Sequence, residues 1–180
     1  MPSALDTLVA DLHRVFEADP AGRKAAALLR DYARAHDDWR EFAFFTEDCY
    51  TRNLVEANDA FELIILCWSS DQCSPVHNHE GQNCWMAVLE GQMEEQRYTF
   101  PTGGGIPEPG ETSLVKAGEV AFIRDEMGLH VVRPVAPARG VSLHLYANPI
   151  PVCNCYCEQT GAVTRRTMQF YSVRGQLVTS

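Results

Sequence analysis

The stretch HNHEGQNCWMAVLEG, residues 77–91, opens with two histidines and continues as an apolar run, CWMAVLEG, that has the length of a β-strand. Short runs of this type, separated by turns, continue along the chain after residue 50. The others are FELIILCW, MEEQRYTF, TSLVK, EVAFIR, LHVVRP, VSLHLYA and TRRTMQFYSV. Because their close spacing leaves no room for crossover helices, we expect at least eight mostly antiparallel strands, closed as a small barrel or folded as a jelly roll. The clearest loop is PTGGGIPEPGE, residues 101–111.

Residues 1–48 have a helical pattern instead. An amphipathic helix capped by Ser3 is predicted from apolar residues at helical spacing, which are Leu5, Leu8, Val9, Leu12 and Phe16. Asp19 and Pro20 are typical of an N-cap and a first turn, and they predict a second helix through about Ala35. Its apolar side includes Ala25, Leu28, Leu29 and Tyr32. Four aromatic residues should pack the helix pair onto the strands: Trp39, Phe42, Phe44 and Phe45.

The composition is typical of one globular domain over residues 1–180, mostly β, with a helical region at 1–48 and a barrel at 49–180. The chain has 180 residues and is 46% apolar, which is enough for one core without crosslinks or a partner. A formal charge of −9, with no cluster of Lys and Arg, argues against a nucleic-acid partner. No run approaches the roughly 18 apolar residues of a membrane span, and the N-terminal stretch is acidic and amphipathic, unlike a signal sequence. We therefore expect a cytoplasmic monomer.

Seven cysteines are an odd number, and without a secretory signal a disulfide scaffold is not expected. Cys67, inside FELIILCW, is most simply a small core residue. The segment VCNCYC puts Cys153, Cys155 and Cys157 at alternate positions, so that three thiols on one strand face could bind a soft metal or become oxidised. Their spacing does not fit a zinc finger, and structural thiols are the simpler interpretation.

His77 and His79 would point to the same face of an extended strand, where both imidazoles can reach one ion about 2 Å from each nitrogen. A lone pair of this kind is weak support for a metal site, since histidines are often satisfied in other ways. A third ligand could come from His130 in MGLHVV or from His144 in SLHLY, and the residues alone do not decide between them. Glu80 follows His79 directly and should face away from the ion.

The spacing from His77 to Gly91 resembles the first motif of the cupins, with Cys84 where that motif has a glutamate. Without the carboxylate, three neutral histidines would leave a divalent ion with its full charge. Such an ion favours an anionic ligand and deprotonates a coordinated thiol, which suggests a thiol substrate. Iron and zinc both remain compatible, because three histidines and an open position also describe zinc hydrolytic sites.

The sequence resembles the cysteine dioxygenases, iron-dependent cupin enzymes that convert cysteine to cysteine sulfinic acid. The resemblance runs in the family's order through CYTRNLV at residue 49, ELIILCW, HNHEGQNCW, MGLHVV, VSLHLY and TGAVTRRTMQF. It implies that His77, His79 and His130 bind one Fe(II) per chain. It also implies that Arg52 in YTRN pairs with the substrate carboxylate.

The same resemblance implies that Cys84 and Tyr146 form the family's thioether crosslink, which would fix the phenol beside the open metal positions. Ser142 and His144 share a strand face with Tyr146, and the family uses this row as a hydrogen-bonded support. His144 would therefore orient Tyr146 instead of binding metal. Tyr50 corresponds to a family tyrosine that contacts the substrate.

The chain departs from the family at several positions. Animal members have a serine and two prolines after the crosslink tyrosine, with a cis bond before the first proline, whereas this chain has Ala147-Asn148-Pro149. A cis bond before Asn148 would cost about 3 kcal/mol, so we expect trans there. Pro134 stands where the second cupin motif has asparagine. By its place in the family, Cys153 lies near the pocket entrance, and Met168 either lines the pocket or packs in the core.

The leading hypothesis is an iron(II) thiol dioxygenase that adds both atoms of O2 to the sulfur of L-cysteine, with the thiolate and amine on iron and the carboxylate on Arg52. One alternative is a 3-mercaptopropionate dioxygenase, although such relatives tend to have glutamine at the arginine position and to lack the crosslink cysteine. A second is a non-catalytic metal-binding cupin sensor. A third is a zinc hydrolase, for which no positioned general base is evident.

Overall fold

A computed structural model describes residues 2–101, 103 and 105–178. The helices are α1 (Ala4–Ala18) and α2 (Ala25–Ala35), with the short 3-10 helices η1 (Asp38–Phe42) and η3 (Asp125–Met127). The strands are β1 (Thr51–Ala57), β2 (Phe61–Trp68), β3 (Val76–His77), β4 (Cys84–Glu90), β5 (Gln92–Tyr98), β6 (Pro109–Lys116), β7 (Val120–Ile123), β8 (Leu129–Pro134), β9 (Gly140–Ala147), β10 (Val152–Tyr156), β11 (Val163–Thr167), β12 (Ser172–Val173) and β13 (Gln176–Leu177). No helix of the described ranges is long and apolar enough to cross a lipid bilayer.

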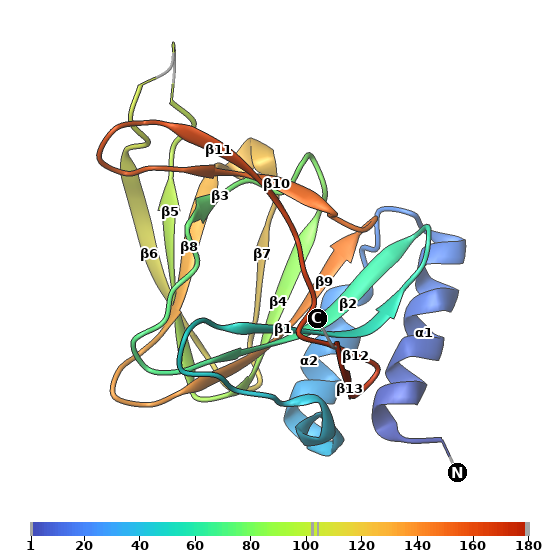
Figure 1. The fold of residues 1–180 in the computed structure, drawn as a ribbon. Coiled ribbons are helices and arrows are strands. Elements are labelled where there is room, and N and C mark those ends of the chain that lie inside the picture. Colours follow the sequence, from blue (N-terminus) through green and yellow to red (C-terminus); the bar gives the residue numbers. More distant parts are fainter. Residues whose placement is uncertain (1, 102, 104, 179–180) are drawn as a thin grey trace.

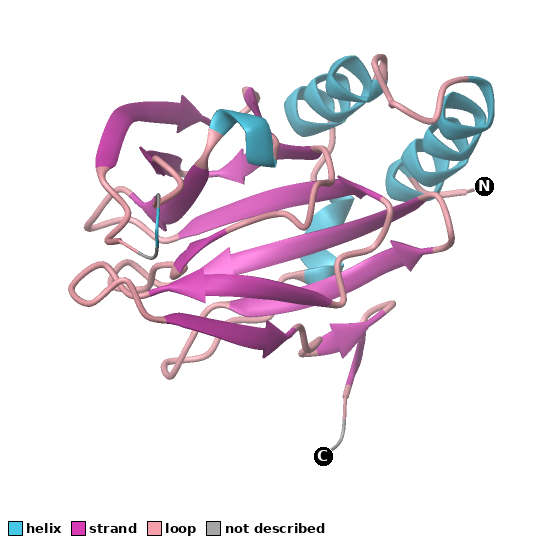
Figure 2. Ribbon diagram, turned by 90° about the horizontal axis from the view of Figure 1, so that it is seen from above, coloured by secondary structure: helices cyan, strands magenta, loops and turns pink. Residues whose placement is uncertain are grey.

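The strands form two sheets, and the mostly antiparallel β fold is as predicted (Figure 1). One sheet has seven strands in the order β13-β12-β1-β2-β9-β4-β7, and the other has six in the order β11-β10-β3-β8-β5-β6. Strands β1 and β12 pair in parallel, while the other recorded pairs are antiparallel. Figure 2 shows both long helices together on one side of the sheets. The molecule is therefore layered as helices, sheet and sheet.

Three central strands, β2, β4 and β9, contribute buried side chains to both faces of the seven-stranded sheet. Successive side chains of a strand point to opposite faces of the sheet. Because both faces of these strands are buried, both sets of side chains must be apolar. One face packs under the helices through Leu63, Ala87 and Leu143 and their alternate neighbours. The other packs against the second sheet through Ile64 and Met86. Two separate cores thus explain why runs such as FELIILCW are apolar without interruption. Burial of each large apolar side chain in either core contributes about 1.5–3 kcal/mol to the free energy of folding.

The first helix is confirmed, including its cap. Ser3 Oγ accepts the backbone N–H of Asp6, and the Asp6 carboxylate accepts the N–H of Ser3. Asp38, from η1, accepts the free N–H of Leu5 at 2.8 Å. The helix therefore begins where two carboxylates and a hydroxyl satisfy its unpaired donors.

The predicted start of the second helix is wrong, although its end at Ala35 is right. Asp19 ends α1, where its N–H bonds the carbonyl of Val15, and its carboxylate accepts the N–H groups of Ala21 and Arg23. These bonds stabilise a turn at Asp19 and Pro20, and α2 begins only at Ala25. An N-cap residue is equally suited to a turn, which explains the error.

The aromatic residues after α2 divide between two places. Trp39 is buried beneath the helices, and Phe42 and Phe45 pack against the same core as predicted. Phe44 does not join them, and its ring lies 6.2 Å from that of Tyr171 near β12.

The predicted strands agree closely with β2, β4, β5, β7, β8 and β9. Two expectations need correction. The run TRRTMQFYSV is not one strand, because β11 ends at Thr167 in one sheet and β12 begins at Ser172 in the other. The loop expected at 101–111 ends earlier, since β6 already begins at Pro109, and residues 102 and 104 lie outside the described part.

Candidate metal centre and pocket

Three histidines converge from two neighbouring strands of the six-stranded sheet. His77 is the last residue of β3, and it stands opposite His130 of β8 in the strand register. Their Nε2 atoms are 3.3 Å apart. His79 follows two residues beyond the end of β3, so the extended strand expected through this residue stops earlier. One ring nitrogen from each of the three lies within 4.8 Å of the others, an arrangement that could hold one metal ion.

Hydrogen bonds hold two of these imidazoles with Nε2 toward the common centre. Nδ1 of His77 lies 2.9 Å from the carbonyl of Pro75. Nδ1 of His130 lies 2.8 Å from Oε1 of Glu95, which is buried on β5. A neutral imidazole that donates Nδ1–H in this way has a free lone pair on Nε2, as a metal ligand needs.

The surroundings of His79 indicate that the three-histidine cluster suits a metal ion. It is 1% exposed, and neither of its ring nitrogens has a hydrogen-bond partner among the described residues. Its backbone N–H and that of Gly81 donate to the two carboxylate oxygens of Asp125, each at 2.7 Å, which fixes the turn carrying the ring. A buried imidazole left unpaired costs free energy, and an ion bound at one of its nitrogens would remove part of that cost.

The protonation states agree with metal binding. Burial lowers the pKa of His77, His79 and His130, and the neighbouring imidazoles lower the pKa of His79 further. The three rings are therefore neutral at pH 7. Glu80 points outward as predicted and bonds Arg165 at 2.8 Å on the surface. The cluster is thus a neutral three-nitrogen set, which leaves a bound divalent ion its full charge.

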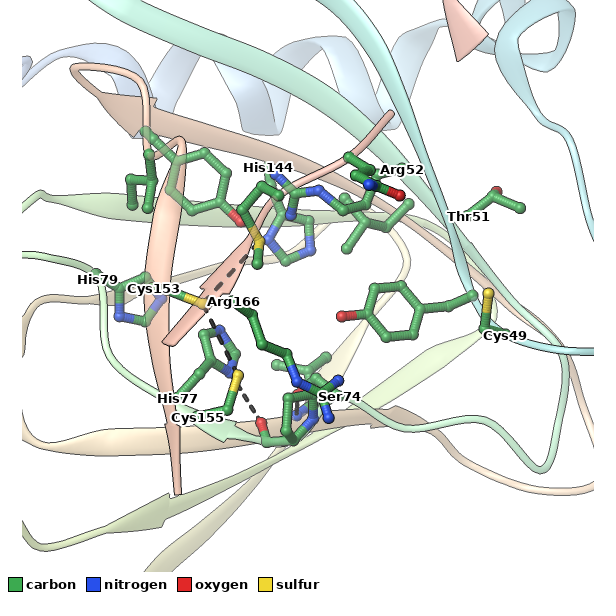
Figure 3. A pocket seen from close by; sticks show the side chains of 18 of the residues that line it. Cys49, Thr51, Arg52, Ser74, His77, His79, His144, Cys153, Cys155 and Arg166 are labelled. Atoms are coloured by element: carbon green, nitrogen blue, oxygen red, sulfur yellow. Dashed lines mark hydrogen bonds between the residues drawn. The ribbon is translucent and has the colours of Figure 1, made fainter. Parts of the chain in front are cut away.

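A cavity of about 380 Å³ opens over the histidines, between the two sheets (Figure 3). Arg52 of β1 and Tyr50 just before it line this cavity, as does Tyr146 of β9. The Arg52 side chain is 12% exposed and reaches Oε1 of Glu62 at 3.3 Å. Its Nε has no partner among the described residues. A buried guanidinium with unused donors is suited to bind a carboxylate.

The side chains of Ser142 and His144 form a hydrogen-bonded row with Trp68. Nε1 of Trp68 donates to Oγ of Ser142 at 2.9 Å, and this oxygen lies 2.9 Å from Nε2 of His144. Because indole can only donate, the Ser142 oxygen is the acceptor in the bond from Trp68. The His144 ring centroid lies 6.2 Å from that of Tyr146. His144 lines the cavity but is outside the three-histidine group.

Cys84 and Tyr146 stand directly opposite each other on β4 and β9. Both are buried, and burial raises the pKa of each side chain. Tyr146 therefore keeps its proton and can donate a hydrogen bond into the cavity. Tyr50 keeps its proton for the same reason, because burial raises its pKa, and its ring stacks on Trp68 with centroids 4.3 Å apart.

Several residues of the site were missed by the sequence analysis. Glu95 and Glu62 are buried acids at inward positions of β5 and β2, and an acid in the apolar phase of a strand pattern was the available signal. Asp125 gave no such signal, because it begins the short helix η3, far along the chain from His79. Cys155 was missed as a pocket residue, whereas the resemblance had placed Cys153 near the pocket; both line the cavity, with sulfurs 4.0 Å apart. The hydrogen bond from Cys153 lowers the pKa of Cys155 to about 7.

The peptide bond between Ala147 and Asn148, just after β9, is trans as expected. The cis peptide bond recorded among the described residues is Ala136–Pro137, so Ala147–Asn148 is trans. Asn148 has a φ of 67°, and its side chain donates to Oε1 of Gln82 at 2.8 Å. Met168 and Arg166 line the cavity.

Comparison with known proteins gives a family match and curated relatives. The family model described as "Cysteine dioxygenase type I" matches residues 1–159. Cysteine dioxygenase type 1 of Danio rerio is 34% identical, with 97% of this chain and 90% of the relative covered. The Homo sapiens protein of the same name is 32% identical, with 97% and 89% covered.

Solved structures share the fold. The protein TT1209 from Thermus thermophilus has a TM-score of 0.52 at 20% identity, covering 63% of this chain and 96% of that one. A Klebsiella pneumoniae protein with a double-stranded β-helix domain has a TM-score of 0.51 at 12% identity, covering 75% and 98%. The fold is thus that of double-stranded β-helix proteins.

Proposed function

Since this chain belongs to the cysteine dioxygenase type I family, we propose that it oxidises the thiol of L-cysteine with O2 to the sulfinate, using one Fe(II) per chain. The observation that carries the proposal is the meeting, in one cavity, of three neutral histidines and a buried arginine with unused donors. The histidines suit a divalent ion, and the arginine suits the carboxylate of an amino acid.

His77, His79 and His130 are the proposed iron ligands, the first and third through Nε2. When bound, iron(II) supplies redox chemistry with O2 and a Lewis-acidic centre for the thiolate. The protein contributes orientation: Pro75 and Glu95 hold two rings by Nδ1, so the site is formed before the substrate arrives.

Arg52 is the proposed carboxylate-binding residue. It stays charged at any working pH, and its burial makes the charge costly unless an anion shares the cavity. Glu62 meets only part of this need, because it makes one contact of 3.3 Å with the guanidinium and Nε has no partner within the described ranges. A thiol with a carboxylate completes the pairing, whereas cysteamine leaves the guanidinium as it is.

Tyr146 is the proposed hydrogen-bond donor to the reacting oxygens or to the substrate. Its raised pKa keeps the hydroxyl protonated, which supports this role. The strand register with Cys84 supports the proposed thioether bond between the two side chains. The Trp68–Ser142–His144 row supports the same wall of the cavity.

The test is oxygen consumption by protein reconstituted anaerobically with ferrous iron. L-cysteine, 3-mercaptopropionate and cysteamine are offered separately, and the sulfinate product is quantified. Uptake with cysteine should fall about 10- to 150-fold in kcat/KM for Arg52→Gln, as expected for losing a charged hydrogen-bonded partner. The surface variant Arg174→Gln, which loses only a contact with Glu56, is the matched control.

Preference for 3-mercaptopropionate over cysteine would move the assignment to that activity. One bound iron without uptake of oxygen by any thiol would refute a dioxygenase and favour a binding protein. Hydrolytic activity that is restored by zinc and not by iron would favour a hydrolase.

A further inference from the structure

Three sulfur atoms beside the histidines form a second donor set in the same cavity. Sγ of Cys153 lies 4.0 Å from Sγ of Cys155 and 4.0 Å from Sδ of Met168. Both cysteines are buried on β10, at 4% and 6% exposure, and all three residues line the cavity. Cys155 stands opposite His77 in the β10–β3 register, so the sulfur set adjoins the nitrogen set. Figure 3 shows Cys153 and Cys155 next to His77.

We propose that Cys153, Cys155 and Met168 form a binding site for a soft monovalent metal ion, Cu(I), separate from the three histidines. Thiolate and thioether sulfurs are soft ligands that select Cu(I), whereas imidazoles suit harder divalent ions. The proposal goes beyond the oxidation of cysteine, and its test does not depend on that activity.

The sulfur separations fit three-coordinate geometry. An ion about 2.3 Å from two sulfurs that lie 4.0 Å apart makes an S–M–S angle of about 120°. A tetrahedral site at the same bond length needs sulfurs only about 3.8 Å apart. The separation between Sγ of Cys153 and Sδ of Met168 is the same 4.0 Å. Two of the three sulfur–sulfur distances therefore fit a trigonal, three-coordinate ion. Sγ of Cys153 is within hydrogen-bond distance of both other sulfurs, and the ion would replace the hydrogen of this thiol.

The surroundings suit the resulting charge. Binding releases two protons to the buffer and leaves two thiolates and one monovalent cation, with a net charge of −1. Arg166 of β11 stands directly opposite Cys153 and lines the cavity, so it can balance this charge. Phe170 and Ile150 belong to the apolar core beside the sulfurs, and they limit competition from water.

The position of the site has a consequence for the proposed enzyme. An ion on Cys155 shares the cavity with His77 and Arg52, where cysteine must bind. Copper(I) should therefore block the substrate while leaving iron in place. The cysteines at 153 and 155 would make the pocket sensitive to a soft metal through residues that do not hold the iron.

The experiment titrates iron-loaded protein anaerobically, without added thiol, with Cu(I) in competition with bicinchoninate. One Cu(I) per chain is expected to be retained, with a copper X-ray absorption spectrum fitted by sulfur ligands. Cys153→Ser and Cys155→Ser should each weaken binding by at least about a hundredfold, since even outer residues of metal sites cost 10- to 100-fold. Met168→Leu, which keeps the volume, should weaken it less.

Cys157→Ser is the matched control, because Cys157 follows on the same segment and is not among the described residues that line the cavity. Its copper affinity should equal that of the wild type. Melting temperature and iron content identify variants that have not folded. Equal copper binding by the Cys153→Ser/Cys155→Ser double variant would overturn the proposal. A copper spectrum fitted by imidazole ligands would overturn it as well.

Discussion

Replacing Glu95 by glutamine should weaken iron binding without removing any ligand. Glu95 is 2% exposed, and its Oε1 lies 2.8 Å from Nδ1 of His130. Glutamine has nearly the same shape and its amide oxygen can still accept that N–H. The change therefore removes the negative charge while keeping the hydrogen bond, so the ring stays in position but becomes a weaker base.

The expected loss follows from this geometry. Outer carboxylates that bond a metal-ligating histidine contribute about 10- to 100-fold to metal affinity, or about 1.4–2.8 kcal/mol. The low dielectric around a buried pair favours the upper part of that range, although Arg97 shields the second oxygen at 3.7 Å. We expect a decrease of about 30-fold or more in iron(II) affinity.

The assay is anaerobic competition between the protein and a colorimetric iron(II) chelator. Glu94→Gln is the matched control, since Glu94 is the preceding residue on β5 but faces outward and pairs with Arg133. Its affinity should stay at the wild-type value. Wild-type affinity in a folded Glu95→Gln variant would refute the argument that this carboxylate strengthens the His130 ligand.

Three further predictions concern stability and the proposed crosslink. Burial raises the pKa of Asp38, but bonds from Leu5 N–H and Tyr32 outweigh it and lower the pKa overall. Asp38→Asn should therefore cost about 1–2 kcal/mol in urea unfolding at pH 7, and the difference should vanish as pH falls through the lowered pKa. Gly91→Ala should lower the melting temperature more than Gly81→Ala: both glycines have positive φ, but only the first Cβ would meet a backbone oxygen, at 2.6 Å. Equal shifts would contradict this. Intact mass after turnover should reveal a wild-type fraction about two hydrogens lighter, absent in Cys84→Ser; its absence from both would refute the crosslink.

Strand periodicity predicted most of the fold, because the two cores impose it directly. FELIILCW, LHVVRP and VSLHLYA are strands with almost the predicted bounds. The start of α2 could not be predicted, since Asp19 and Pro20 suit a turn as well as a helix cap. The switch of the chain between sheets after Thr167 also escaped, because a continuous β-type run has no local signal for changing its partner.

The candidate site divides in the same way. A pair such as His77 and His79 is visible in the sequence, but the choice of His130 over His144 depends on which strand pairs with β3. Glu95 and Glu62 become functional candidates only when their strands are known to face the cavity. Long-range pairing is a property of the whole chain, so these contacts needed the structure.

The opposed positions of Cys84 and Tyr146 have a consequence for the unfolded chain. A covalent bond across this pair would close a loop of about 60 residues, and the lost chain entropy corresponds to about 4 kcal/mol of added stability. For a chain of 180 residues this corresponds to a rise of roughly 10 °C in the unfolding temperature. If the bond forms during turnover, the unfolding temperature would increase with the number of turnovers. Molecules that had already turned over substrate would then stay folded at temperatures that unfold molecules without the crosslink.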